Sequence, residues 1–176
     1  NDLKGLQDFK AGIHSDTSGR LGKWRKNQDC CKWEGILCSN ESGRVVSMSL
    51  PGLYTSGGAP VQSAMVGELS PSITLLDFLE VIDIGELVGL TGKLPPSIGL
   101  RLPHLRKLNF LGNKFTGVLP ESICKLSKLE ELYLQENAFS GFLPSCIGSV
   151  KNLRRLDIHS NKLSGVIPVS ITSLIS

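Results

Sequence analysis

The sequence predicts an α/β solenoid, in which short strands and helical turns are stacked along one axis. First, the 176 residues include 28 Leu, 19 Gly and 9 Pro, a composition typical of short elements that are interrupted at regular intervals. Second, three segments, 105–120, 129–144 and 153–168, align without a gap at a period of 24 residues. Apolar residues, Asn, Gly and Pro stay in register in all three, and chance does not produce such agreement.

The overall composition excludes several classes of protein. Hydrophobic residues make up 40% and charged residues 20% of the chain, and the formal net charge is +3. This charge is too small for a nucleic-acid-binding surface, and no apolar stretch reaches the roughly 18 residues that a membrane span needs. The sequence holds no Gly-x-Ser-x-Gly elbow, Walker loop, kinase signature or His-Glu-x-x-His motif. We therefore expect no catalytic residue, cofactor, metal or nucleic-acid partner, and no contact of this segment with a membrane.

The first 44 residues differ from the rest and begin with a predicted helix. Asp2 is placed to cap this helix, and its apolar positions fall on one face, namely Leu3, Leu6, Phe9 and Ile13. A helix suits this place because the first core layer of a solenoid would otherwise face water. Residues 1–44 are therefore expected to form a cap on the stack.

The cysteines indicate disulfide bonds and an oxidising compartment. Cys30, Cys31 and Cys38 lack the paired spacing of a zinc site, and disulfides persist outside the cytosol. Asn40 begins an Asn-Glu-Ser sequon for N-glycosylation, which agrees with secretion. The chain has no initiator Met or signal peptide, so we interpret it as a mature or trimmed segment. The odd number of cysteines suggests a missing partner upstream.

Two degenerate repeats precede the regular three, so that residues 45–176 hold five repeats of about 24 residues. One covers 79–95, with one extra residue and no Asn at the equivalent position. The other begins with a strand over 45–50 and continues at 65–69, and residues 51–64 are expected to bulge out as a loop. Their Gly, Ser and Pro content is compatible with a recognition insertion and with a disordered bulge.

Each repeated position has a physical role. In Leu-x-x-Leu-x-Leu, alternate side chains of a short strand point into the core, and stacked strands form a parallel sheet whose intervening positions face outward. The side-chain amides of Asn113, Asn137 and Asn161 are placed to hydrogen-bond backbone groups of adjacent turns. The Gly positions suit a turn with positive φ, and the Pro positions suit the first turn of a short helix or 3₁₀ segment.

Cys124 and Cys146 lie in successive repeats but two positions out of register. A disulfide between them requires Cα atoms within about 7 Å of one another. The sequence leaves a bridge and two separate buried thiols as equal alternatives.

The repeats resemble the plant-specific leucine-rich repeat, whose pattern is LxxLxxLxLxxNxLxGxIPxxLxxL. The tail Gly-x-Leu/Ile-Pro separates this class from other leucine-rich repeats, and it stands here at 117–120, 141–144 and 165–168. The resemblance implies a right-handed superhelix with a concave parallel β-sheet, a second short sheet, and 3₁₀ or helical segments on the convex side. It covers residues 79–176 strongly and 45–78 moderately.

Residues 30–38 resemble the N-terminal cap of the same family, with its Cys-Cys-x-Trp-x-Gly-Val-x-Cys core. By this resemblance Cys31 pairs with Cys38. Cys30 then pairs with a cysteine just upstream of residue 1, which accounts for the odd count. Both bridges are structural in the family.

The double-cysteine cap is similar to that of receptor-like proteins, polygalacturonase-inhibiting proteins and DNA-damage-tolerance-like secreted proteins. Polygalacturonase inhibitors carry about ten repeats and a cysteine-paired C-terminal cap, whereas this chain stops at Ile175 and Ser176 inside a repeat. We therefore expect the chain to be truncated before a C-terminal cap.

The outward positions of the strands form the candidate binding surface. Charges on adjacent strands, about 4.8 Å apart, alternate in sign along two rows, which is compatible with weak, solvated ion pairs. Exposed aromatic or apolar residues beside Arg are less expected on a solvated face and are frequent interface anchors. Histidine adds a route to pH-dependent binding, although an exposed His without a role is commoner. The predicted partner-binding residues are Arg106, Leu111, Glu131, Tyr133, Gln135, Arg154, Asp157 and His159.

These features predict a non-enzymatic, extracellular recognition module of a plant cell-surface receptor ectodomain or secreted leucine-rich repeat protein. Its partner would be a peptide or protein ligand on the concave face, with a co-receptor as a further partner. The alternative is an apoplastic inhibitor of a pathogen cell-wall hydrolase, similar to the polygalacturonase inhibitors. A third reading is a solenoid whose flat repeat array is itself the binding surface. The expected location is the apoplast, the cell wall or the outer face of the plasma membrane.

Overall fold

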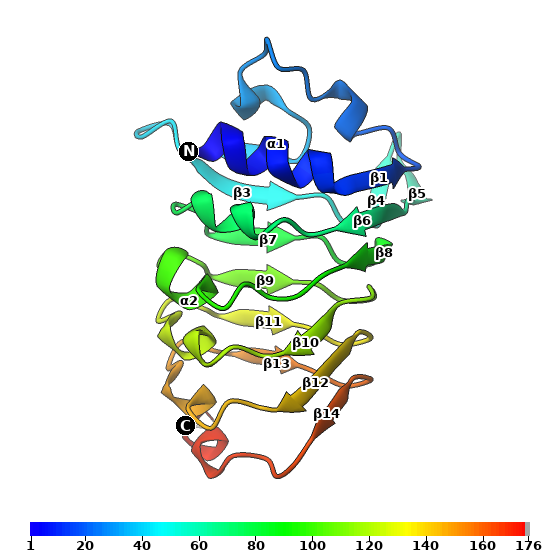
Figure 1. The fold of residues 1–176 in the computed structure, drawn as a ribbon. Coiled ribbons are helices and arrows are strands. Elements are labelled where there is room, and N and C mark those ends of the chain that lie inside the picture. Colours follow the sequence, from blue (N-terminus) through cyan, green and yellow to red (C-terminus); the bar gives the residue numbers. More distant parts are fainter. Residues whose placement is uncertain (175–176) are drawn as a thin grey trace.

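The computed structural model describes residues 1–174 and consists of stacked turns with a β-sheet along one side (Figure 1). The six-stranded sheet has the order β13-β11-β9-β7-β3-β2, and its neighbours pair in parallel except β2, which pairs antiparallel with β3. Because β2 comes from the first 44 residues, the sheet extends one strand beyond the five that the repeats predict. The strands are β2 (Ile36–Cys38), β3 (Val45–Ser49), β7 (Val81–Asp83), β9 (Lys107–Asn109), β11 (Glu131–Tyr133) and β13 (Arg155–Asp157).

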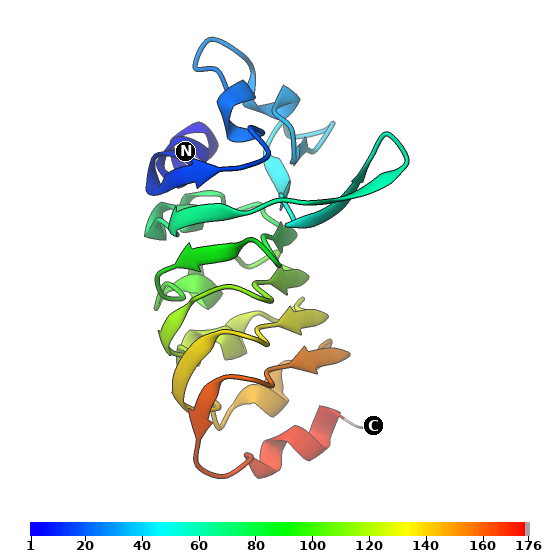
Figure 2. The same ribbon diagram turned by 90° about the vertical axis from the view of Figure 1, so that its right-hand side faces the viewer.

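A second row of strands and a row of short helical segments complete each turn (Figure 2). The parallel pair β6–β8 carries antiparallel β1 on one edge, and β10, β12 and β14 form a separate parallel sheet. These strands are β1 (Ile13–Asp16), β6 (Met65–Glu68), β8 (Val88–Thr91), β10 (Thr116–Val118), β12 (Ala138–Phe142) and β14 (Lys162–Ser164). The helical segments are α2 (Ile98–Arg101) and 3₁₀ segments at Pro71–Leu75, Glu121–Lys125, Ile147–Ser149 and Val169–Leu174.

The core lies between these rows and is built from the repeated apolar positions. The central residues of three neighbouring strands, Ile82, Leu108 and Leu132, are in register and fully buried. The ring of Phe115 packs against those of Phe110 and Phe139, with centroids 4.5 and 6.2 Å away. Burying one such side chain stabilises the fold by roughly 1.5–3 kcal/mol, so the stacked rows hold successive turns together.

The asparagines connect each turn to its neighbour. The Asn137 side chain donates to the carbonyl oxygens of Phe110 at 2.8 Å and Leu134 at 3.1 Å, and its Oδ1 accepts from the backbone N–H of Phe115 at 3.0 Å. Asn113 and Asn161 make the same kinds of bond one repeat earlier and later. The amide therefore satisfies backbone groups that the tight turn would otherwise bury unpaired.

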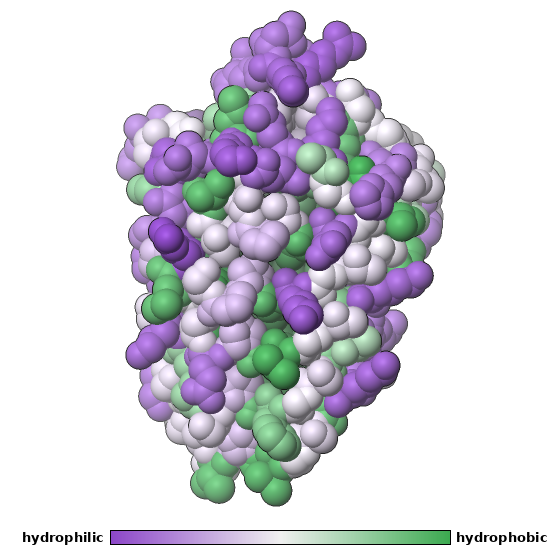
Figure 3. All heavy atoms as spheres, viewed as in Figure 1, coloured by the Kyte–Doolittle hydropathy of each residue, from purple (hydrophilic) through white to green (hydrophobic). Residues whose placement is uncertain are grey.

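A row of exposed apolar side chains lies along the sheet formed by β10, β12 and β14, on the side of the molecule seen in Figure 3. Its members are Val118, Phe142 and Val166. Val118 and Phe142 each cover a glycine of the next repeat, because a Cβ on Gly141 would lie 2.9 Å from Val118 and one on Gly165 would lie 2.4 Å from Phe142. Both glycines also have positive φ, at 75° and 79°, which side chains disfavour.

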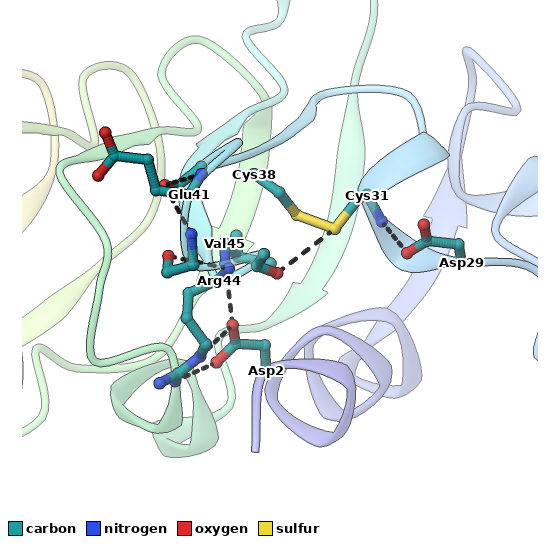
Figure 4. The surroundings of a disulfide bond; sticks show 10 residues. Asp2, Asp29, Cys31, Cys38, Glu41, Arg44 and Val45 are labelled. Atoms are coloured by element: carbon teal, nitrogen blue, oxygen red, sulfur yellow. Dashed lines mark hydrogen bonds and ion pairs between the residues drawn. A yellow bond between two sulfur atoms is a disulfide. The ribbon is translucent and has the colours of Figure 1, made fainter.

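The N-terminal helix α1 (Asp2–Gly12) lies beside the first turn of the stack. The expectation that Asp2 caps it is wrong, because Asp2 is the first helical residue and the N-cap, Asn1, makes no side-chain capping bond. The Asp2 carboxylate instead accepts from the Arg44 guanidinium, at 2.6 and 2.9 Å, and from the Val45 N–H (Figure 4). The carboxylate that the local sequence assigned to helix capping therefore binds Arg44, which lies 42 residues further along the chain.

Two tryptophans fill the space between α1 and the cysteine-rich segment. Trp24 and Trp33 are stacked with centroids 5.0 Å apart, and both are buried. They follow 3₁₀ segments at Leu21–Lys23 and Cys30–Lys32. A disulfide joins Cys31 to Cys38 (Figure 4), which ties the second of these segments to β2.

A second disulfide joins Cys124 to Cys146, with Cα atoms 5.9 Å apart. Cys124 lies within the 3₁₀ segment Glu121–Lys125, and Cys146 immediately precedes the segment Ile147–Ser149 of the next repeat. Of the two alternatives that the sequence left open, the structure contains the bridge. Cys30 is the free cysteine among residues 1–174, and the expected break at Ile175 and Ser176 lies outside the described residues.

Residues 51–64 form a hairpin, where the sequence predicted a loop. It consists of β4 (Leu53–Ser56) and β5 (Ala59–Gln62), which pair antiparallel around Gly57 and Gly58. Both glycines have positive φ, as a two-residue hairpin turn requires. The hairpin projects from the stack on the side of the six-stranded sheet (Figure 2).

Candidate binding surface

The outward side chains of β9, β11 and β13 lie in rows across the six-stranded sheet. The register places Lys107, Glu131 and Arg155 in one row. A second row, two residues further along, is Asn109, Tyr133 and Asp157. The parallel pairing thus brings together residues 24 positions apart in the chain, as the repeat period predicts.

Two basic residues at the start of β9, Arg106 and Lys107, form ion pairs with carboxylates of the adjacent strands. Arg106 Nη2 lies 2.6 Å from Glu130 Oε1, in the cross-strand arrangement that the alternating signs predict. Lys107 Nζ lies 2.8 Å from Asp83 Oδ2 on the preceding strand, so it does not pair with Glu131 as the row pattern suggests. Asp83 is nearly buried and also accepts from the Asn109 amide, at 3.0 Å, which makes it the better partner.

Tyr133 and Arg155 form a polar pair on β11 and β13. Arg155 Nη1 donates to the Tyr133 hydroxyl at 3.3 Å, and both side chains keep contact with solvent. The hydrogen bond to Tyr133 and the nearby charge of Glu131 raise the pKa of Arg155 above its usual value. The pair presents a flat aromatic ring beside a fixed cation, the combination that anchors many protein interfaces.

His159 and Asp157 lie at the exposed end of the same surface. His159 Nε2 is 3.6 Å from Asp157 Oδ1, and the His159 side chain keeps 59% of its exposure. Its Nδ1 is 2.9 Å from the Ser160 hydroxyl. An imidazole in this position is open to contact with a partner.

The expected exposure of Gln135 is wrong, since only 8% of this residue is accessible. The Gly112 N–H donates to its carbonyl, and the Glu136 N–H that follows donates to the carbonyl of His159, so the backbone here lies between two neighbouring turns. The side chain is enclosed as a result, and its Oε1 has no hydrogen-bond donor among the described residues. Gln135 is not available as a surface contact.

The remaining predicted residues lie where the strand pattern placed them. Arg154 is exposed, and Leu111 and Glu131 are half-buried. Within residues 1–174, neither Glu131 nor Arg154 forms an ion pair. The prediction left Arg155 out of the binding residues although it contacts Tyr133. The 24-residue offset places Arg155 opposite Glu131, and from there its long side chain reaches the Tyr133 hydroxyl diagonally across the two strands.

No helix within residues 1–174 has the length and apolar character needed to cross a bilayer. The stacked turns, the parallel sheet and the asparagine bonds define a repeat solenoid with one open sheet face. The sequence matches the family described as leucine rich repeat N-terminal domain over residues 1–39. It matches the leucine rich repeat family over 104–126, 128–150 and 152–174. The chain belongs to the plant leucine-rich repeat proteins.

Known proteins of this kind are similar over much of the chain. The DNA damage-repair/toleration protein DRT100 of Arabidopsis thaliana is 39% identical over 119 residues, which cover 64% of this chain and 31% of that protein. One chain in the crystal structure of the BIR3–SERK2 complex from Arabidopsis thaliana superposes with a TM-score of 0.82 and 32% sequence identity. The superposition covers 97% of this chain and 87% of the matched chain.

The ectodomain of the receptor kinase GASSHO1/SCHENGEN3 from Arabidopsis thaliana, solved with CASPARIAN STRIP INTEGRITY FACTOR 2, gives a TM-score of 0.86 at 25% identity. The superposition covers 99% of this chain and 20% of that one. The chain therefore spans about a third of the length of DRT100 and a fifth of the GASSHO1/SCHENGEN3 chain.

Proposed function

We propose that this chain is an extracellular recognition module that binds a peptide or protein ligand across the six-stranded sheet. It would act as part of a plant cell-surface receptor ectodomain or of a secreted leucine-rich repeat protein. The observation that carries the proposal is the Tyr133–Arg155 pair, joined at 3.3 Å on an open face. An aromatic ring and a cation held together lose little side-chain entropy when a partner docks on them.

The distribution of unpaired charge supports the same surface. Arg106 and Lys107 are neutralised by carboxylates on adjacent strands, whereas Glu131 and Arg154 have no ion-pair partner within residues 1–174. Charges that are free in the unbound protein contribute to the choice of partner and to the association rate. We place the ligand's main contacts over β11 and β13, at Tyr133, Arg155, Glu131, Arg154, Asp157 and His159.

Similar proteins support two kinds of partner. The GASSHO1/SCHENGEN3 ectodomain was solved in complex with CASPARIAN STRIP INTEGRITY FACTOR 2, and BIR3 was solved in complex with SERK2. By analogy, this chain would bind a ligand on its sheet and a co-receptor elsewhere. The proposed location is the apoplast, the cell wall or the outer face of the plasma membrane, where the two disulfides persist. We further propose that the chain has no enzymatic activity of its own.

The proposal includes the organisation of the chain. Residues 1–44 act as the N-terminal cap and residues 45–176 as five repeats of a right-handed superhelix, the hand that parallel strand crossovers almost always take. Cys30 pairs with a cysteine upstream of residue 1, and Asn40 carries a glycan. The Cys31–Cys38 bridge and the stacked tryptophans beside it are compatible with a cap that protects the first core layer.

A capture experiment tests the binding face. The intact disulfide-bonded chain is immobilised, exposed to plant apoplastic fluid, and each retained protein or peptide is identified and then titrated in purified form. We expect the double variant Tyr133→Ala/Arg155→Glu to lose at least tenfold in affinity, about 1.4 kcal/mol. The control variant Arg101→Glu on α2 changes the same charge away from the sheet and should bind normally.

Two results would decide against the proposal. Equal affinity of the double variant and the wild type would remove the six-stranded sheet as the binding face. Capture of a cell-wall hydrolase whose activity falls on binding would favour the inhibitor function instead.

A further inference from the structure

The hairpin β4–β5 is held firmly at its base. The Gly52 N–H donates to the Gly85 carbonyl, and the Ser63 N–H donates to the Gly52 carbonyl, both at 2.7 Å. Gly52 packs so closely that a Cβ in its place would lie 1.8 Å from the Glu86 carbonyl oxygen. The two ends of the insertion are therefore closed on one another and joined to the next repeat.

A buried arginine of the cap fixes the hairpin from the other side. Only 4% of Arg20 is exposed, and its Nη2 donates to the Pro51 carbonyl at 2.9 Å and the Ser63 hydroxyl at 3.0 Å. Its guanidinium carbon lies 4.5 Å from the centre of the Tyr54 ring. One side chain thus contacts the entry, the exit and the first strand of the hairpin, which orders the projection.

A cleft of about 320 Å³ lies between this hairpin and the six-stranded sheet. We call it the hairpin cleft. Pro51 and Leu53 line it from the hairpin, and Leu53 remains 51% exposed. The sheet side is formed by Asp83, Glu86, Asn109 and Leu111. The lining therefore combines an apolar part with two carboxylates and contains no lysine or arginine.

The charges of the hairpin cleft do not cancel. Lys107 neutralises Asp83 at 2.8 Å. Glu86 forms no ion pair with any residue of the described chain, and its side chain is half-buried. A partly desolvated carboxylate beside apolar groups attracts a cation more strongly than one in open solvent.

We propose that the hairpin cleft binds a lysine or arginine side chain of a peptide or protein partner, together with an apolar residue adjoining it in that partner. The cation would pair with Glu86 and the apolar residue would pack on Leu53 and Leu111. The inference rests on the proposed function only in taking the partner to be a polypeptide. It adds a second contact region, at the N-terminal end of the sheet, and names the chemistry that fills it.

The test uses three synthetic octapeptides, acetylated and amidated, that differ only in their central pair, Arg-Leu, Gln-Leu or Glu-Leu, between Gly-Ser flanks. Each is titrated into the isotope-labelled chain and followed by amide chemical shifts. We expect the Arg-Leu peptide to shift the amides of 52–53, 85–86 and 109–111. The Gln-Leu peptide should bind about tenfold more weakly, as expected for loss of a charge-assisted hydrogen bond, and the Glu-Leu peptide should not bind.

Two variants with a matched control locate the site. Glu86→Gln should abolish the preference for Arg-Leu over Gln-Leu, and Leu53→Ala should weaken both peptides. The control is Glu136→Gln, because Glu136 has nearly the same φ as Glu86, 57° against 58°, but lies two repeats away from the hairpin. It should bind as the wild type does.

Other outcomes overturn the proposal. They are no shift with any peptide, equal binding of Arg-Leu and Gln-Leu by the wild type, or an unchanged preference in Glu86→Gln. Failure of the hairpin cleft leaves the effect of Tyr133→Ala/Arg155→Glu on captured ligands untouched. Conversely, a normal peptide preference with no effect of that double variant would reject the proposed function alone.

Discussion

The carboxylate of Asp2 lies 2.6 Å from the guanidinium of Arg44, and Arg44 also contacts Asp77. This cluster joins the start of α1 to the start of β3 and to the loop before β7. Arg44 in addition lies over the Phe78 ring, 4.5 Å from its centre. A single cation therefore connects the N-terminal segment to the first two turns of the stack.

This contact predicts an acid-sensitive stability. Burial raises the pKa of Asp2, but the hydrogen bonds from Arg44 and from the Val45 N–H outweigh burial and lower it below its ordinary value of 3.8. A lowered pKa means that the stabilisation is present above pH 3.8 and is lost as the pH falls through the lower folded-state value. Urea unfolding at several pH values should show this loss in the wild type.

The variant Asp2→Asn should remove that part of the pH dependence and lower the free energy of unfolding at neutral pH by about 1–3 kcal/mol. Asp29→Asn is the control, because Asp29 is exposed, forms no ion pair with any described residue, and can be replaced by Asn without losing the acceptor for the Cys31 N–H. Equal pH profiles of Asp2→Asn and the wild type would contradict the assignment.

Arg20 is predicted to order the hairpin β4–β5. In Arg20→Ala, the Pro51 carbonyl and the Ser63 hydroxyl lose their donor, and Tyr54 loses its cation. Amide hydrogen exchange across 53–62 should accelerate as the hairpin opens. Arg20→Lys should not restore protection because an ammonium cannot reproduce the planar guanidinium contacts. Arg25→Ala, at an exposed position, should leave the exchange rates unchanged.

The Cys124–Cys146 bridge is predicted to stabilise the middle of the stack. It closes a loop with a sequence separation of 22, so its removal should lower the free energy of unfolding by about 3 kcal/mol. Urea unfolding of Cys124→Ala/Cys146→Ala measures the effect. Alkylation of the unfolded, unreduced wild type should modify only Cys30 among the five cysteines if no partner is attached to it. Labelling of Cys124 or Cys146 would argue against the bridge.

Asn137 is predicted to contribute more to stability than its partial exposure suggests. Asn137→Ala leaves the Phe115 N–H without its acceptor and removes one of the two side-chain donors to the Phe110 carbonyl, which keeps Asn113. This should cost about 1–3 kcal/mol. Asn152→Ala is the matched control, since its amide donates to the Ser127 carbonyl on the exposed side. Comparable unfolding midpoints for the two variants would show that the buried hydrogen bonds matter little.

Asn40 is predicted to carry an N-glycan in a plant secretory host. It is exposed in the turn between β2 and β3, where the Ser39 hydroxyl accepts from the N–H groups of Glu41 and Ser42. Glycosidase treatment should lower the mass of the secreted chain. Asn40→Gln and Ser42→Ala should each give the lower mass without treatment, and an unchanged mass in all three would mean that the site is unoccupied.

Sequence periodicity was enough to predict the strands, the core rows and the asparagine positions. These features depend on residues within one 24-residue unit, such as Leu132 and Asn137, and stacking identical units repeats their environment. The exceptions all involve partners from different units. Lys107 pairs with Asp83 because that carboxylate is nearly buried, and the burial of a side chain cannot be read from the sequence pattern.

The candidate site was predicted less completely for the same reason. The pattern placed Tyr133 on the outward face, but the burial of Gln135 follows from the way neighbouring turns enclose the residue after β11. The hairpin cleft was not predicted. Leu53 and Glu86 belong to different repeats, and the Gly- and Ser-rich insertion 51–64 that contains Leu53 shows no periodic pattern of apolar residues.

The sequence by itself determined a repeating solenoid, since a short-range apolar rhythm is stabilised in the same way at every turn. Three features were decided only by the tertiary structure. Asp2 forms an ion pair with Arg44 and does not cap the helix, and a disulfide joins Cys124 to Cys146. Arg20 hydrogen-bonds the base of the hairpin that projects beside the sheet. Each of these contacts joins residues more than 20 positions apart. Their free energy depends on distance and burial after stacking, which composition and spacing do not encode.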